Sequence, residues 1–145
     1  MLAFLVGVDH ELQYLRSDLL DYKGEAVENL RKHLTESVHA LQVKHLAEEF
    51  STEACDLNRV SASVAQLVAR DLGITHLFCD PTTEERRRYG ITSHDDRECF
   101  WLQRLLTIKP TRLLFVCGDS HLETFGDKLR SAGYEVKILS RGWRV

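Results

Sequence analysis

Two histidines follow two strongly apolar stretches at opposite ends of the chain, each in the pattern Gly-x-x-His. His10 closes the first pattern, after residues 3–8, and His121 closes the second, after residues 112–117. An apolar run of this length that ends at a glycine is typical of a strand buried on both faces of a parallel sheet. Because imidazole can accept a proton near neutral pH or bind a metal ion, both histidines are candidates for chemistry.

The second pattern also predicts the start of a helix. Ser120 and Glu123 have the spacing of a capping box, in which the Ser120 hydroxyl accepts from the Glu123 N–H and the Glu123 carboxylate accepts from the Ser120 N–H. We therefore expect a helix to begin at about Ser120, with His121 at its positive end. This end of the helix and any bound metal ion would both disfavour imidazolium, so we expect a lowered pKa for His121.

Three carboxylates lie at the ends of other stretches that we expect to be strands. Glu48 and Glu49 end an apolar stretch at 43–50, and Asp80 ends another, which Pro81 stops because proline cannot donate to a strand ladder. Neighbouring residues of a strand point to opposite faces, so at most one of Glu48 and Glu49 can share a site with the histidines. The sequence leaves open which one does so.

Arg97 lies on a helix expected over 93–107, one turn before Trp101 and on the same, inward face. A charge that faces the core requires a partner, and the carboxylates at the strand ends are the natural candidates. We therefore expect Arg97 to pair with one of them, Glu48 or Glu49.

The elements that position these side chains alternate between strands and helices. Apolar periodicity and capping residues predict helices over 25–42, 60–72, 82–90, 93–107 and 120–132. Short apolar runs predict strands over 3–8, 43–50, 75–80, 112–117 and 134–139. Residues 53–59 are expected to be a connection and residues 140–145 a tail, whereas residues 11–23 give no clear assignment.

This alternation predicts a single α/β domain over residues 1–145. We expect a three-layer α/β/α sandwich with a mainly parallel sheet of about five strands, since each connection is long enough for a right-handed crossover. The strands at 3–8 and 112–117 are the most continuously apolar, so they should lie side by side at the centre of the sheet. Their histidines would then meet at the carboxyl edge, where open α/β sheets bind ligands.

Composition disfavours several classes of partner. The 145 residues include 19 basic and 22 acidic side chains, a net charge of −3 that gives no attraction to nucleic acid or to an anionic membrane. No apolar run approaches the ~20 residues of a membrane span, and the first apolar run is short for a signal peptide. The four cysteines show no CxxC spacing, which favours reduced thiols. We therefore expect a cytoplasmic protein that binds neither nucleic acid nor membranes.

The motifs also resemble those of a known superfamily. Gly7-Val8-Asp9-His10 and Gly118-Asp119-Ser120-His121 resemble the paired GxxH motifs of the erythromycin-esterase/ChaN-like superfamily and of the related TraB/Tiki proteins. The stretch Arg97-Glu98-Cys99-Phe100-Trp101 resembles the arginine-containing helix motif that precedes the second GxxH in these proteins. Ala47 followed by Glu48 or Glu49 resembles their acidic residue after the second strand.

The resemblance implies a compact α/β core with a site formed by His10, His121 and the glutamate after the second strand, with Arg97 in support. Members of the superfamily include esterases, metal-dependent proteases and haem-binding lipoproteins. Larger members have helical insertions that supply substrate pockets, and this short chain lacks them.

Two mechanisms fit these residues. In the first, His10, His121 and one of the two glutamates, for which we take Glu48, hold a divalent metal ion, Zn, Mn, Co or Fe, that activates a water molecule. Asp80 would then be a further ligand or would orient a histidine. In the second, no metal takes part: a histidine acts as the base on a water molecule and a carboxylate orients it. Arg97 and the helix N-terminus then stabilise the oxyanion.

The sequence thus predicts a hydrolase that acts on an ester or amide, and it favours the metal-dependent mechanism. The expected catalytic residues are His10, His121, Glu48, Glu49, Asp80 and Arg97. The residues expected to contact a small-molecule or peptide ligand are Gly7, Asp9, Gly118, Asp119 and Ser120. The alternative is a module that binds a small molecule, a metal, haem or another protein without turnover, and a homo-oligomer is compatible with either function.

Overall fold

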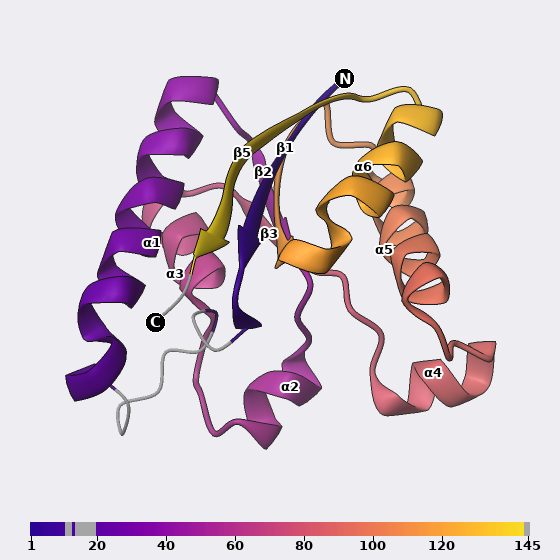
Figure 1. Cartoon of the computed structure of the whole chain (residues 1–145), viewed down its shortest axis with the longest axis horizontal. Coiled ribbons are helices and arrows are strands. Elements are labelled where there is room, and N and C mark those ends of the chain that lie inside the picture. The colour runs from indigo at the N-terminus through magenta and orange to yellow at the C-terminus, as the bar shows by residue number, and fades with distance from the viewer. Residues whose placement is uncertain (11–12, 14–19, 144–145) are drawn as a thin grey trace.

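A computed structural model of the chain describes residues 1–10, 13 and 20–143, and within them the strands form one parallel sheet (Figure 1). The sheet has five strands in the order β3-β2-β4-β1-β5. The strands are β1 (Leu2–Val8), β2 (His45–Glu48), β3 (Thr75–Phe78), β4 (Arg112–Gly118) and β5 (Glu135–Trp143). The predicted α/β fold with a parallel, five-stranded sheet is confirmed.

The two most apolar strands lie side by side in the middle of this sheet, as predicted. β1 pairs with β4 in register from Leu2 opposite Arg112 to Val8 opposite Gly118. Apart from their first residues, both strands are buried along their whole length. Because the two strands are parallel and end at the same level, the turns that follow them leave the sheet at the same edge.

Helices cover both faces of the sheet. They are α1 (Leu20–Leu41), α2 (Thr52–Leu57), α3 (Val64–Leu72), α4 (Thr83–Tyr89), α5 (His94–Ile108) and α6 (Leu122–Ser131). Figure 1 shows α1 and α3 on one side of the strands and α5 and α6 on the other. Phe4 and Val6 of β1 pack in a cluster with α1 and α3, whereas Ala3 and Leu5 pack in a cluster with α5 and α6. Among the described helices, none is long and apolar enough to cross a membrane.

Local capping signals fix several helix boundaries as predicted. Gly73 ends α3 in the left-handed conformation, with φ of 65°. Capping boxes begin α4 at Thr82 and α5 at Ser93, each with the side chain and backbone hydrogen bonds that define the motif. These boundaries depend on contacts within four residues, which a sequence pattern can specify.

The capping box predicted at Ser120 and Glu123 is wrong. A short 3₁₀ turn, η3 (Asp119–His121), follows β4, and α6 begins only at Leu122. No side chain caps either of these turns among the described residues. Ser120 lies exposed inside the 3₁₀ turn, so it lacks the extended backbone that lets an N-cap hydroxyl reach the N–H three residues later.

Other boundaries also differ from the prediction. Residues 52–57 form the short helix α2, because Ser51 caps it by accepting from the Ala54 N–H at 3.0 Å. β5 continues through Trp143, which pairs with Val8, so residues 140–143 are strand and not tail. α1 begins at Leu20 within the stretch that the sequence left unassigned, of which residues 11, 12 and 14–19 lie outside the described part.

Candidate functional site

The two Gly-x-x-His turns meet around the carboxylate of Glu49, which follows β2. His10 Nε2 lies 3.4 Å from Glu49 Oε1, and His121 Nε2 lies 3.3 Å from Glu49 Oε2. The backbone N–H of Gly118 donates to Oε1 at 2.9 Å, and the guanidinium of Arg97 donates to Oε2 at 2.6 Å. Each oxygen of Glu49 therefore has two partners, and these partners come from three segments of the chain: the turn after β1, α5 and the turn at the end of β4.

Glu49 is buried, with 2% of its surface exposed. Burial alone would raise the pKa of its carboxyl. The hydrogen bond from His121, the attraction of His10 when it is protonated and the Gly118 N–H together outweigh burial, so the pKa is lowered from its ordinary value of 4.5. Glu49 is therefore a fixed negative charge at the centre of the site at neutral pH.

His121 is equally buried, and its ring lies between two carboxylates. Nδ1 lies 2.6 Å from Glu98 Oε1, and Nε2 faces Glu49. Burial lowers the pKa of His121, but the hydrogen bonds to Glu49 and Glu98 raise it further, so the net pKa lies above the ordinary 6.5. The lowered pKa that we expected is wrong, because the two adjacent carboxylates outweigh the effect of burial. The two carboxylates thus favour the protonated form of His121, and in that form the ring has no lone pair for a metal ion.

Arg97 points inward and pairs with a carboxylate after β2, as expected, and the partner is Glu49. Its guanidinium also donates to Asp80 Oδ1 at 3.0 Å and lies 5.5 Å from the centre of the Trp101 ring. Asp80 in turn accepts from Trp101 Nε1 at 3.0 Å and from Arg86 at 2.8 Å. Asp80 thus holds Arg97 in place and contacts neither histidine in any described hydrogen bond or ion pair.

Glu48 lies on the other face of the sheet, away from His121. It accepts hydrogen bonds from Ser63 Oγ, from His76 Nε2 at 2.8 Å and from Gln13 Nε2 at 3.0 Å. The predicted metal set of His10, His121 and Glu48 is therefore not brought together. The physical reason is the alternation of β2, in which consecutive side chains point to opposite faces of the sheet.

The residues around Glu49 do not fit a divalent cation. Among the described residues, no group of three or more His, Cys, Asp and Glu side chains could hold a metal ion. The Arg97 guanidinium lies 2.6 Å from one oxygen of Glu49, and the His121 ring beside it has a raised pKa. A metal ion there would lie against the positive charge of the Arg97 guanidinium.

The predicted ligand-contacting residues divide into two groups. Gly118 borders the site, since a side chain there would meet His10 Nε2 at 3.1 Å. Gly7 and Asp119 shape the turn instead: Gly7 lies against Asp119, whose carboxylate accepts from the Gly142 N–H at 2.9 Å. Asp9 and Ser120 are exposed beside the turns.

Three residues of the site were missed by sequence reasoning. Glu98 contacts His121, His94 lies exposed with its ring centre 4.6 Å from that of His121, and Gln13 contacts His10. Glu98 follows Arg97 directly in the arginine-containing stretch, which was the available signal. His94 and Gln13 carried no signal, because nothing in the sequence places them beside the other histidines.

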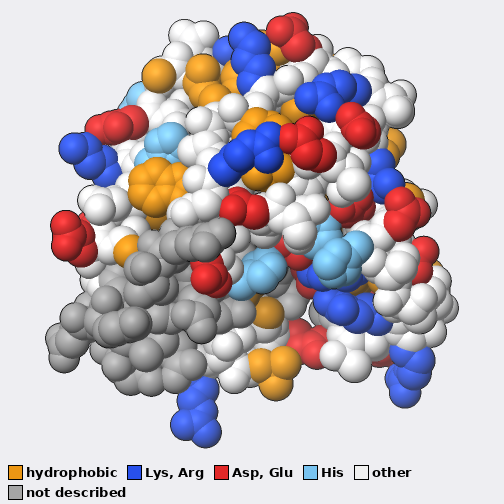
Figure 2. All heavy atoms as spheres, in the orientation of Figure 1, with side chains coloured by type: hydrophobic (Ala, Val, Ile, Leu, Met, Phe, Trp, Pro, Cys, Tyr) orange, Lys and Arg blue, Asp and Glu red, His pale blue; other side chains and the backbone are white. Residues whose placement is uncertain are grey.

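Histidine atoms are exposed beside acidic side chains near the middle of the face in Figure 2.

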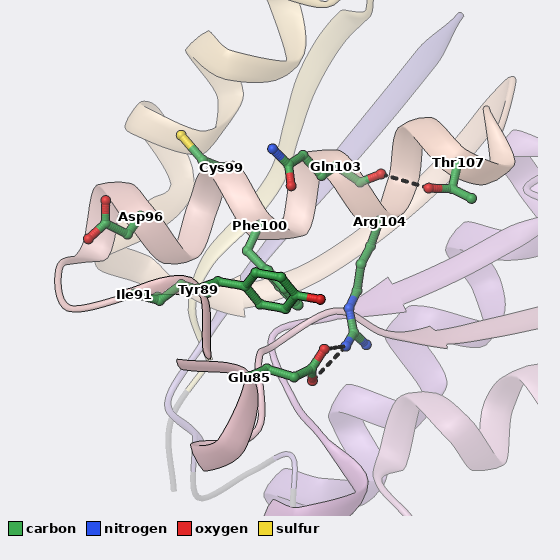
Figure 3. A pocket seen from close by; sticks show the side chains of 9 residues that line it. All are labelled: Glu85, Tyr89, Ile91, Asp96, Cys99, Phe100, Gln103, Arg104 and Thr107. Carbon is green, nitrogen blue, oxygen red and sulfur yellow. Dashed lines mark hydrogen bonds and ion pairs between the residues drawn. The ribbon is translucent and has the colours of Figure 1, made fainter. Parts of the chain in front are cut away.

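A separate cavity of about 570 Å³ lies between α4 and α5 (Figure 3). It is lined by Glu85, Tyr89, Ile91, Asp96, Cys99, Phe100, Gln103, Arg104 and Thr107. Arg104 there lies over the Phe100 ring at 4.7 Å and pairs with Glu85 at 2.6 Å. None of the predicted catalytic residues lines this cavity, so the cavity is separate from the candidate site around Glu49.

Comparison of the chain with protein-family models, with curated proteins and with solved structures finds no match. Membership of the erythromycin-esterase/ChaN-like superfamily therefore stays a prediction from the two Gly-x-x-His motifs and the residues between them.

Proposed function

We propose that this chain hydrolyses a small ester or amide, with His10 as the general base and without a bound metal ion. The observation that carries the proposal is the environment of His10. Its side chain is 47% exposed, so solvent and substrate can reach it, while Nε2 lies 3.4 Å from the buried carboxylate of Glu49. A fixed negative charge beside Nε2 stabilises the imidazolium that forms when this nitrogen takes a proton.

The proposed reaction begins when His10 Nε2 accepts a proton from a water molecule, whose oxygen adds to the carbonyl carbon of the substrate. The electron pair of the C=O bond moves to the oxygen. When the tetrahedral intermediate collapses, the C–O or C–N bond breaks and the leaving group takes the proton back from His10.

Hydrolysis of 4-nitrophenyl acetate by the purified protein tests this function. We expect kcat/KM to fall about 10²- to 10⁴-fold in His10→Gln, the usual contribution of a general base, and to be unchanged by EDTA. His39→Gln is the matched control, because His39 is exposed on α1 and should leave the rate as it is.

Two outcomes would contradict the proposal. Activity that EDTA abolishes and Zn or Mn restores would show that the mechanism requires a metal ion. A protein that hydrolyses no member of a panel of esters and amides would be a binding module, the alternative function predicted from the sequence.

A further inference from the structure

Glu48 is a second buried carboxylate, and the proposed reaction does not use it. Its surface is 0% exposed. Ser63 and His76 donate to Oε1, and Gln13 donates to Oε2. A carboxylate removed from water needs such partners, but Ser63 and His76 already supply two. Gln13, the third partner of Glu48, also contacts a residue of the candidate site.

Gln13 connects Glu48 to His10. It is 1% exposed, and its Oε1 lies 2.8 Å from His10 Nδ1. Its Nε2 donates to Glu48 Oε2 at 3.0 Å and to the backbone oxygen of Glu49 at 3.4 Å. Both partners of Nε2 are acceptors, so the amide can lie only with its NH₂ toward Glu48 and its oxygen toward His10.

This amide orientation determines which nitrogen of His10 carries the proton. Gln13 Oε1 accepts only, so His10 Nδ1 must donate. A neutral imidazole has one N–H, and when this is on Nδ1 the lone pair is on Nε2. Nε2 is the nitrogen beside Glu49 and Gly118, at the exposed edge of the site.

We infer that Glu48 and Gln13 are positioning residues that hold neutral His10 in its Nδ1–H tautomer, so that Nε2 is the basic nitrogen. Glu48 and Glu49 then both act on His10, although they lie on opposite faces of the sheet. Glu49 faces Nε2 directly, and Glu48 fixes Nδ1 through Gln13. The catalytic consequence rests on the proposed function, whereas the tautomer is a property of the folded chain.

Long-range ¹H–¹⁵N NMR of the histidine side chains tests the tautomer directly. The His10 signals are identified by their loss in His10→Gln. At a pH where the ring is neutral, we expect Nδ1 to have the shift of a protonated nitrogen and Nε2 that of an unprotonated one. In Gln13→Met, which keeps the length of the side chain but removes the acceptor, we expect this preference to be lost. Gln103→Met is the control, since Gln103 is exposed on α5.

The kinetic expectation is a fall in kcat on the order of 10- to 100-fold in Gln13→Met with little change in KM, as is typical when the partner that fixes a histidine is removed. Glu48→Gln provides a second variant, because an amide at this position lets the Gln13 side chain reverse. An Nε2–H tautomer in the unmodified protein would overturn the inference. A protein with the Nδ1–H tautomer but no hydrolytic activity would overturn the proposed function alone.

Discussion

Arg97 holds a full positive charge between two carboxylates while only 17% of its side chain is exposed. Its guanidinium lies 2.6 Å from Glu49 and 2.9 Å from Asp80. Removing it would leave Glu49 without its closest positive partner and Asp80 with Arg86 alone. We expect Arg97→Ala to lower the free energy of unfolding by about 3–5 kcal/mol, the usual cost of breaking a buried pair.

Urea denaturation of Arg97→Ala and of Arg87→Ala measures this cost. Arg87 is exposed on α4, and surface substitutions usually change stability by no more than about 0.5 kcal/mol. Equal denaturation midpoints for the two variants would show that the Arg97 charge is solvated.

Glu48 and Glu49 show how far the sequence can predict the position of a single side chain. Strand alternation showed that only one of them could lie with His121. It could not show which, because this depends on which face of β2 meets α5 and α6. In the structure Leu46 packs in the cluster with α1 and α3 and Ala47 in the one with α5, and this places Glu48 and Glu49 on the corresponding faces. The choice is thus made by tertiary packing.

Elements were predictable where a few neighbouring residues determine them. The capping boxes at Thr82 and Ser93 follow loops whose backbone is free to become extended, as an N-cap requires. Ser120 has the same spacing to Glu123, but only Asp119 separates it from the end of β4, and the chain turns there at once into η3. The same pattern therefore fails where the preceding strand fixes the backbone.

Gly7 shows how closely β1 and the turn after β4 approach each other. A Cβ atom at Gly7 would overlap Asp119 Oδ1 and lie 2.6 Å from Leu122 Cδ1. We expect Gly7→Ala to lower the free energy of unfolding by about 1–3 kcal/mol, as is usual for an overpacked core.

Gly24 provides a control for the same substitution. It lies in α1, and a Cβ atom there would meet nothing within 4 Å. Gly24→Ala should therefore raise stability by about 0.5–1 kcal/mol, because alanine is the better helix former. Thermal unfolding of both variants measures the two effects, and a stabilising Gly7→Ala would show that the turn can move away without loss.

At the scale of the whole molecule, the central pairing of β1 with β4 brings residues from the two ends of the chain to one site. This pairing was predictable, because only strands buried on both faces are apolar throughout. The connection through Gln13 was not, because it lies in the stretch 11–23, which has no apolar periodicity. A hydrogen-bonding residue in such a stretch leaves no pattern in the sequence.

The site also makes the stability of the whole fold depend on pH. The pKa of His121 is raised above 6.5 in the folded state, so its contribution is complete below pH 6.5 and is lost as the pH rises through the folded pKa. The pKa of Glu49 is lowered from 4.5, so its contribution is present above pH 4.5 and is lost as the pH falls through the folded pKa. His33 has a lowered pKa because it is partly buried, so it changes stability only below pH 6.5.

Above pH 6.5, therefore, His121 should dominate the change in stability, until the thiols of the unfolded chain begin to ionise near their ordinary pKa of about 8.5. We expect the free energy of unfolding to decrease from pH 6.5 to about pH 8, and this slope to flatten in His121→Gln, whatever the absolute stability of that variant. Urea denaturation at several pH values measures the slope, and His39→Gln should retain it because His39 is exposed on α1. A slope that persists in His121→Gln would show that the proton lost in this range belongs to another group, and that His121 is not the imidazolium between Glu49 and Glu98.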